Sequence, residues 1–201
     1  MAIMLRRVLS RAYFNRPTLR VARSLLGKYL IRANGSTRIT TKIIEVEAYV
    51  GPDDRASHAS RGRTKRTDVM FGQPGVAYVY FIYGMYHCFN VVTEREGYPA
   101  AILIRAVEPA EGQVCVGGAP MAGPPPTLID GPGRVCRYLQ IDRKLNQLDL
   151  TLGQTLWIED RGERVPASAI TAYPRIGVDY AGEWATKLWR FRLHNTRGKR
   201  Q

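Results

Sequence analysis

The chain has 201 residues, 45% of them hydrophobic, with 30 basic against 17 acidic side chains, a net charge of +13 and a pI near 10.0. This composition excludes a disordered chain and predicts a single folded domain over residues 1–201. The charge favours nucleic acid as the partner; an anionic membrane surface is the alternative, but no apolar run is long enough to span a bilayer.

A helix and a hairpin are predicted near the start of the chain. Residues 17–27 place apolar side chains at helical spacing between an initial proline and a final glycine. A short strand over 28–32 follows, and Asn34-Gly35 predicts a tight hairpin into a long second strand over about 36–50. We interpret the many basic residues of this region as one positive face of the fold, and not as an organelle transit peptide.

The second strand carries two acidic side chains on one face. In KIIEVEAYV, alternation assigns four residues to the core: Ile44, Val46, Ala48 and Val50. It assigns to the other face Ile43, Glu45, Glu47 and Tyr49. Same-face neighbours lie about 7 Å apart at Cα. A solvated strand face is the usual place for carboxylates, but an acidic pair beside a tyrosine is unexpected in a chain so poor in acids.

A tyrosine-rich hairpin follows a polar, basic loop over 51–75. Residues 76–92 read VAYVYFIYGMYHCFNVV; Tyr78 and Tyr80 share a face, and the alternation breaks at Tyr83, beside a glycine that suits a tight turn. One interpretation is a core hairpin, because aromatic side chains favour strands. The other is that the tip is a wedge and Tyr80 a stacking surface.

Two polar side chains interrupt apolar strands downstream. Arg105 needs an anionic partner, because an unpaired buried charge is costly. It either forms a structural ion pair with Glu45 or Glu108 or holds a phosphate near Glu47. Asn90 is either satisfied locally or faces a pocket, where it sorts ligands by their hydrogen-bonding edge.

The remaining segments carry weaker signals. A strand over 100–107 is predicted to end at Glu108-Pro109, and the Gly- and Pro-rich residues that follow, about 112–131, predict an irregular, mobile surface loop. A helix over 131–139 opens on a glycine turn, a weak signal for a phosphate site, and TLWIED and WRFRL read as strands. Three scattered cysteines and three scattered histidines predict reduced structural thiols and no metal site.

Together these features favour hydrolytic chemistry on nucleic acid. Paired carboxylates suit glycoside hydrolysis, and the N-glycosidic bond of a purine breaks through a transition state of similar oxocarbenium character. Reaching that bond within a duplex requires a nucleotide to be flipped out and stacked on aromatic side chains. One alternative is a carbohydrate hydrolase using Glu45 and Glu47, for which a charge of +13 gives no reason. Another is a non-catalytic DNA lesion-binding protein, which needs no carboxylate near a DNA phosphate.

A long central stretch resembles a known family. Residues 43–92, from IIEVEAYVG to YGMYHCFNVV, and the following ILIRAVEP closely resemble the alkyladenine (3-methyladenine) DNA glycosylases, with looser likeness in SLLGKYL, GPGRVCRYLQI and RIGVDYAGEWATKLWRFRL. The resemblance implies an α+β fold, a compact single domain around a curved, mostly antiparallel sheet from which the β-hairpin protrudes. It also implies a monofunctional enzyme of base excision repair without lyase activity, metal or cofactor. Such an enzyme flips alkylated or deaminated purines out of duplex DNA, hydrolyses the N-glycosidic bond with an activated water and leaves an abasic site.

The resemblance implies three catalytic groups. Glu47 corresponds to the general base that activates the water. Arg105 corresponds to the side chain that holds the phosphate of the flipped nucleotide and helps to set the water. Val178 offers its backbone carbonyl to the same water.

The resemblance also implies a base pocket. Tyr49 and Tyr80 sandwich the extruded base, and His58 contacts its edge. Asn90 disfavours normal guanine by crowding its exocyclic amino group.

At the hairpin tip, Tyr83 intercalates from the minor groove, and Met85 and Tyr86 help to separate the neighbouring bases. Glu45 is expected to be structural and paired with a basic neighbour. The segment QVCVGGAPMAGPPPT departs from the family pattern, so no DNA contact is carried over to it. The implied partner is double-stranded DNA containing damaged purines, met by a monomer without a membrane, in the cytoplasm or in a eukaryotic nucleus.

Overall fold

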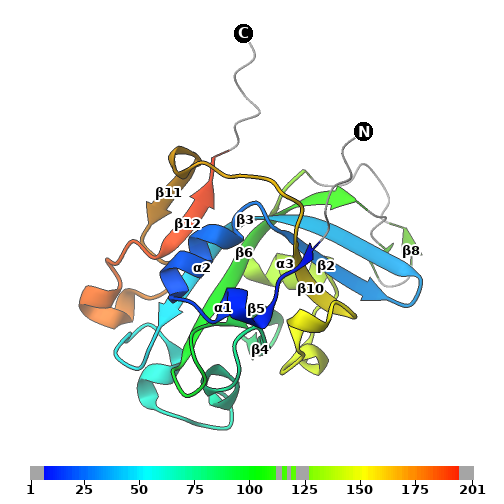
Figure 1. The fold of residues 1–201 in the computed structure, drawn as a ribbon. Helices are drawn as coiled ribbons and strands as arrows, with labels where there is room; N and C mark the ends of the chain where they lie inside the picture. The colour runs from blue at the N-terminus through cyan, green and yellow to red at the C-terminus, as the bar shows by residue number, and fades with distance from the viewer. Residues whose placement is uncertain (1–6, 112–114, 117–118, 121–126, 195–201) are drawn as a thin grey trace.

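Figure 1 shows a curved antiparallel sheet with short helices packed against it; the computed structural model describes residues 7–111, 115–116, 119–120 and 127–194. The strands are β1 (Arg7–Val8), β2 (Tyr29–Asn34), β3 (Thr37–Val50), β4 (Ala77–Ile82), β5 (Tyr86–Val92), β6 (Ala100–Glu111), β7 (Cys115–Val116), β8 (Ala119–Pro120), β9 (Ile129–Asp130), β10 (Leu156–Asp160), β11 (Ile170–Tyr173) and β12 (Arg190–Leu193). The α-helices are α1 (Arg11–Phe14), α2 (Thr18–Leu25) and α3 (Pro132–Tyr138). The 3₁₀ helices are η1 (His58–Arg61), η2 (Asp68–Phe71), η3 (Arg143–Leu145), η4 (Leu150–Leu152), η5 (Ala167–Ala169) and η6 (Asp179–Trp184).

The main sheet has the strand order β1-β10-β2-β3-β6-β5-β4, with β12 beside β3, β11 beside β12 and β9 beside β6. The predicted α+β fold with a curved antiparallel sheet is therefore confirmed. The predicted first helix, the strand after it and the hairpin are also present. Gly27 after α2 and Gly35 in the β2–β3 turn have φ values of +81° and +56°, which glycine adopts without the steric cost of a side chain.

β3 departs from strict alternation at a β-bulge. Ile43 pairs with Val107 of β6, and Glu45 pairs with the adjacent residue, Ala106. Ile44, between them, is therefore an extra residue without a partner in the register of β6. The predicted faces were therefore wrong at two positions: Ile43 lies in the main core, and Ile44 does not belong to that cluster. Beyond the bulge the alternation is regular again, and Val46 faces the core while Glu47 faces the opposite side.

The bulge is also where β3 changes its neighbour on one edge. β3 pairs with β2 as far as Lys42 and with β12 from Glu45 to Glu47. A bulge bends and twists its strand, so the sheet curls at this point. The curl brings the segment between β11 and β12 close to the acidic face of β3.

β6 is longer than predicted. It continues through Pro109 to Glu111, although the proline was expected to end it. Pro109 pairs with Thr41 beside a register shift, and β9 pairs with β6 only at Ala106 and Val107. Within the described residues, β6 therefore has a partner strand on only one of its edges at Pro109. A proline, which has no N–H to donate, is tolerated at such a position.

The Gly- and Pro-rich segment contains regular structure, which the sequence prediction denied. β7 pairs with β8, and β9 pairs with β6. Each of these strands has only two residues, so that a neighbouring glycine or proline interrupts little pairing. The predicted mobility falls mainly on residues 112–114, 117–118 and 121–126, which lie outside the described residues.

Several basic residues near the start of the chain have acidic or aromatic partners in the fold. Ion pairs hold Arg11 to Asp149 and Lys42 to Glu163, and Lys28 lies 2.7 Å from Asp160. Others stack on aromatic rings, as Arg23 does on Phe191. These side chains tie the N-terminal elements to the rest of the fold.

One large hydrophobic cluster joins α2, α3 and the inner face of the sheet. A smaller one forms beneath the loop between β3 and β4, where Met70 and Tyr78 meet Ala101. Cys88 and Cys136 are buried free thiols. No helix in the described part of the chain has the length and apolar character needed to cross a bilayer.

Candidate active site

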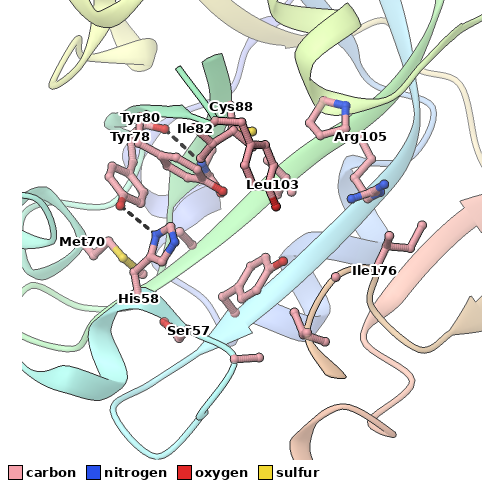
Figure 2. Close-up of a pocket in the computed structure, with 18 of the residues that line it drawn as sticks. Ser57, His58, Met70, Tyr78, Tyr80, Ile82, Cys88, Leu103, Arg105 and Ile176 are labelled. Atoms are coloured by element: carbon pink, nitrogen blue, oxygen red, sulfur yellow. Dashed lines mark hydrogen bonds between the residues drawn. The ribbon is translucent and has the colours of Figure 1, made fainter. Parts of the chain in front are cut away.

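A cavity of about 330 Å³ opens on the acidic face of β3. Its wall is built by the end of β3, the loop after it, the β4–β5 hairpin, the middle of β6 and the segment around η6. In Figure 2, His58, Tyr78 and Tyr80 lie on one side of it, and Arg105 and Ile176 lie on the other. The volume falls in the range of small-ligand pockets, roughly 300–1,000 Å³.

Glu47 lies directly behind this wall with both carboxylate oxygens satisfied. Its Oε1 accepts a hydrogen bond from the backbone N–H of Ile176 at 2.8 Å. Its Oε2 accepts one from the Tyr49 hydroxyl at 3.0 Å and one from Arg105 Nη1 at 3.3 Å. Its three donors all line the cavity, whereas Glu47 itself is 0% exposed. A group that reaches the carboxylate must therefore pass between them.

Burial dominates the electrostatics of Glu47. Removal from water raises the pKa of its carboxyl above the ordinary 4.5, because the charged form loses hydration. Arg105, the Ile176 N–H and the Tyr49 hydroxyl oppose that rise by favouring the charged form. The result is a carboxylate that is more basic than an exposed one and still aligned by donors.

Glu45 is paired with basic neighbours, as the sequence predicted. Its Oε1 accepts a hydrogen bond from Arg190 at 3.0 Å, and its Oε2 accepts one from Arg192 at 2.6 Å. Arg105 bridges the two acids, with Nε 3.5 Å from Glu45 and Nη1 3.3 Å from Glu47. Both sequence interpretations of Arg105 thus remain compatible with its position: it is paired with acids, and it lines the cavity.

Tyrosine rings supply much of the cavity wall. Tyr49 and Tyr80, which the resemblance assigns to the base pocket, both line it. The Tyr80 ring meets the His58 ring edge-on at a centroid distance of 4.7 Å and the Tyr78 ring at 5.1 Å. Arg66 lies over Tyr80, with its guanidinium carbon 4.9 Å from the ring centroid. Burial raises the pKa of both Tyr49 and Tyr80 well above 10, so both hydroxyls stay protonated.

His58 is held as a neutral imidazole. Burial, with the positive charges of Arg66 and Arg61, lowers the pKa of His58 to about 4. Its Nδ1 lies 3.0 Å from the Tyr78 hydroxyl, and its Nε2 lies 3.4 Å from Arg66 Nη2. Because arginine can only donate, Nε2 accepts and Nδ1 carries the proton in this arrangement. Figure 2 shows the Tyr78 contact as a dashed line.

Asn90 faces the cavity from β5 and is satisfied locally as well. Its Nδ2 donates to the Tyr78 carbonyl at 3.1 Å, across the hairpin. The bond fixes the orientation of the amide, since only the –NH₂ end can donate to a carbonyl. Asn90 is thus satisfied locally and also lines the cavity, and its predicted role in sorting ligands stays a prediction. Cys88, two residues earlier on β5, also lines the cavity.

Val178 lines the cavity just before η6 and is 4% exposed. Its carbonyl already accepts a hydrogen bond from the Ala181 N–H at 2.9 Å. A carbonyl oxygen has two lone pairs, so this bond leaves capacity for a second donor.

The hairpin tip projects two apolar side chains into solvent. Tyr83 is 85% exposed and Met85 is 62% exposed. The Met85 N–H donates to the Ile82 carbonyl, and Tyr83 and Gly84 have φ values of +52° and +66°. Two consecutive positive φ values are typical of a type I′ hairpin turn. A bulky residue rarely adopts this conformation, so the turn holds Tyr83 at a conformational cost.

Tyr86 lies differently from its two neighbours at the tip. Its ring packs on Gly133 of α3, where an added Cβ would come within 2.8 Å of the ring. Arg137 lies 5.9 Å from the same ring. Tyr86 thus braces the hairpin against α3 while remaining partly exposed.

Several residues of the site had no role in the sequence analysis. Asp54 and Arg175 form a buried ion pair behind the wall. Tyr180, 69% exposed, stands at the mouth and donates to the Ala56 carbonyl at 3.3 Å. A second hollow of about 320 Å³ adjoins the mouth and is lined in part by Arg55, Arg61 and Arg66. The one sequence signal for this ion pair was Asp54, an acidic residue in the GPDD stretch of a chain poor in acids. Nothing in the sequence indicated that Arg175 is its partner.

A cavity with a tyrosine wall and a recessed carboxylate has the features expected of an enzyme that acts on an extruded nucleobase. The family model described as methylpurine-DNA glycosylase (MPG) matches residues 12–197. The chain belongs to the methylpurine-DNA glycosylase family. It is a monofunctional N-glycosylase that removes alkylated purines from damaged DNA in base excision repair, and the predicted family and function are confirmed.

Relatives from distant organisms match along nearly their whole length. A protein of Methanocella arvoryzae is 52% identical over 185 residues, covering 92% of this chain and 91% of its own. One of Myxococcus xanthus is 50% identical over 182 residues, covering 90% and 88%. One of Legionella pneumophila (strain Corby) is 46% identical over 185 residues, covering 92% and 93%. Each is named as a 3-methyladenine DNA glycosylase.

Proposed function

We propose that Glu47 is the general base of this glycosylase and that 3-methyladenine is among its substrates, as in the names of the relatives. The observation that carries the proposal is the recessed position of Glu47: a buried carboxylate whose three donors all line the cavity. A water admitted between those donors meets an oxygen made more basic by burial. It loses a proton to Glu47 as it attacks the anomeric carbon, and the purine leaves.

Arg105 and Val178 complete the environment of the water. Arg105 lies 3.3 Å from Glu47, so a phosphate of the flipped nucleotide held by this guanidinium is brought close to the base. The Val178 carbonyl, with one lone pair in use, accepts a hydrogen bond from the second O–H of the water, which keeps that proton. Arg105 is also anchored by Glu45, with Nε 3.5 Å from Oε1, so the guanidinium has a second acidic partner that keeps it beside Glu47 when it holds a phosphate.

The extruded purine stacks between Tyr49 and Tyr80, both protonated and uncharged. Base–aromatic stacking contributes roughly 1–3 kcal/mol per base, and the electron-rich tyrosine rings favour a purine that carries positive charge. His58, neutral at physiological pH, contacts the edge of the base. Asn90, whose amide is fixed by the Tyr78 carbonyl, occupies the space that the exocyclic amino group of guanine would need.

The hairpin tip opens the duplex. Tyr83, 85% exposed, inserts from the minor groove into the space that the nucleotide leaves, and Met85 adds apolar surface beside it. Tyr86 both helps to separate the neighbouring bases and steadies the hairpin on α3. The arginine-lined hollow beside the mouth accommodates the phosphates of the duplex.

We expect the native protein to release free base from duplex DNA that carries a single methylated purine or hypoxanthine, and to leave an intact strand with an abasic site. Chromatography of the released base, with and without alkaline cleavage of the strand, measures both products. Undamaged duplex of the same sequence is the control. Tight binding to the lesion duplexes without release of any base would instead support the alternative, a non-catalytic lesion-binding protein.

We expect the single-turnover rate to fall as the pH is lowered, with an acid limb above pH 4.5, the ordinary pKa of glutamate. The base acts as a carboxylate, burial raises its pKa, and activity is lost as pH falls through that raised value. His58, with a pKa of about 4, adds no inflection near its ordinary 6.5. Rates on a hypoxanthine duplex across the acid range measure this; a limb at or below 4.5 would contradict the role of Glu47.

A further inference from the structure

A buried ion pair behind the cavity wall joins segments that are far apart in the chain. The side chains of Arg175 and Asp54 are both 0% exposed. Arg175 Nη1 donates to Asp54 Oδ2 at 2.5 Å, and Nη2 donates to Oδ1 at 2.8 Å. The same guanidinium donates to the backbone carbonyls of Ala48 at 2.9 Å and Trp184 at 3.0 Å. One side chain thus connects the end of β3, the loop after it and η6.

Asp54 organises the loop from its own side. Its Oδ2 accepts a hydrogen bond from the Val50 N–H, and its Oδ1 accepts one from the Ala56 N–H, each at 3.1 Å. The loop that begins at the end of β3 is therefore closed around the carboxylate. This loop leads directly to His58 in the cavity wall.

Two groups of the proposed reaction lie directly against the pair. The Arg175 guanidinium carbon is 4.9 Å from the centroid of the Tyr49 ring. The residue after Arg175 is Ile176, whose N–H donates to Glu47 Oε1 at 2.8 Å. Arg175 itself does not line the cavity, so it meets these groups from behind.

We propose that Arg175 and Asp54 are positioning residues that act through Glu47 and Tyr49. They hold the Ile176 N–H on the carboxylate and support the Tyr49 ring from the side away from the base. The inference rests on the proposed role of Glu47 as the base. It assigns to the pair a part in the reaction although neither side chain touches the substrate.

Stability alone is a weak reason for such a pair. Replacing a buried ion pair with apolar side chains is often neutral or stabilising, since desolvation offsets the attraction. The arrangement also leaves Arg175 Nε without a hydrogen-bond partner among the described residues. What the pair does provide is a fixed geometry for three segments of the wall, each of which supplies residues to the cavity.

The test uses Arg175→Lys and Asp54→Asn, with Arg161→Lys as the matched control. Arg161 forms a comparably buried ion pair with Glu159 of β10, with Nη2 2.7 Å from Oε1. Both side chains are 3% exposed, and neither residue lines the cavity. Single-turnover base release on a hypoxanthine duplex, its pH profile and the Tm are measured for each variant. We expect the site variants to be slower by about 10–100-fold, by analogy with the range found for residues that orient metal ligands from the outer shell.

The pH profile separates positioning from folding. The Ile176 N–H favours the charged form of Glu47, so its loss raises the pKa further and moves the acid limb to higher pH in both site variants. The control is expected to lower Tm without moving the limb. A folded Arg175→Lys or Asp54→Asn protein with native rate and an unmoved limb would overturn the proposal.

A measurement on the native protein keeps the inference testable if both variants fail to fold. Amide hydrogen exchange is expected to show the N–H groups of Val50, Ala56 and Ile176 opening together, since all depend on one ion pair. Fast, independent exchange at Ile176 would overturn the proposal. Retained activity in Glu47→Gln, by contrast, would reject the proposed base. It would not change the result of the hydrogen-exchange measurement on the native protein.

Discussion

Glu47→Gln is expected to lower single-turnover base release by about 10²–10⁴-fold, the usual contribution of a general base. Glutamine has the same shape and keeps an oxygen for the Ile176 N–H, but it cannot take a proton from water. Binding to lesion duplexes is expected to be equal or tighter, because the substitution removes a negative charge near the phosphate that we propose Arg105 holds. Rapid-quench release and equilibrium binding on the same duplex give both quantities.

Glu45→Gln is the matched control for this experiment. Glu45 lies two residues away on the same strand, is equally buried and shares Arg105 with Glu47. Its loss is expected to reduce Tm, because Arg190 and Arg192 each lose one acidic partner, and to slow release much less than Glu47→Gln does. Equal loss of rate in both variants would contradict a single base and favour a two-carboxylate mechanism, as in carbohydrate hydrolases.

Tyr83→Ala is expected to slow release from a fully paired duplex by about 5–150-fold, which corresponds to the 1–3 kcal/mol of base–aromatic stacking. The same lesion in a bulge or opposite a mismatch is expected to be affected much less, since its base is already loosely stacked. The ratio of the two rates therefore isolates the wedge. It is measured under single-turnover conditions with enzyme in excess.

Phe81→Ala is the control on the same hairpin. Phe81 is also an exposed aromatic residue, at 42%, but it lies on β4 and pairs with the His87 ring at 4.8 Å, away from the tip. It is expected to leave the ratio between paired and bulged substrates unchanged. Equal losses on both substrates in Tyr83→Ala would remove the wedge assignment.

Local patterns predicted much of this fold. Proline and glycine marked the ends of α2, the Asn34-Gly35 pair marked the β2–β3 turn, and alternation placed Glu47 and Tyr49 on one face of β3. Each of these features depends on residues that are close in sequence. The family resemblance supplied the function and the roles of residues that local patterns leave open, such as His58.

The errors arose where distant segments decide the structure. The bulge at Ile44 belongs to the pairing between β3 and β6, and Pro109 is tolerated because of what lies on the other edge of β6. The Arg175–Asp54 pair joins residues 121 positions apart, so neither residue indicates its partner. The arginines near the start of the chain likewise have partners, such as Asp149, that only the folded chain brings close.

The left-handed backbone at Tyr83 has an evolutionary consequence. Glycine or asparagine adopts such a conformation more readily than tyrosine, so either would relax the turn and raise stability. Selection for thermal stability alone would therefore move this position away from tyrosine, and only selection on duplex DNA would keep it. A library of this protein sorted by both criteria would divide at residue 83, with more stable proteins that act slowly on duplex DNA on one side and faster, less stable ones on the other.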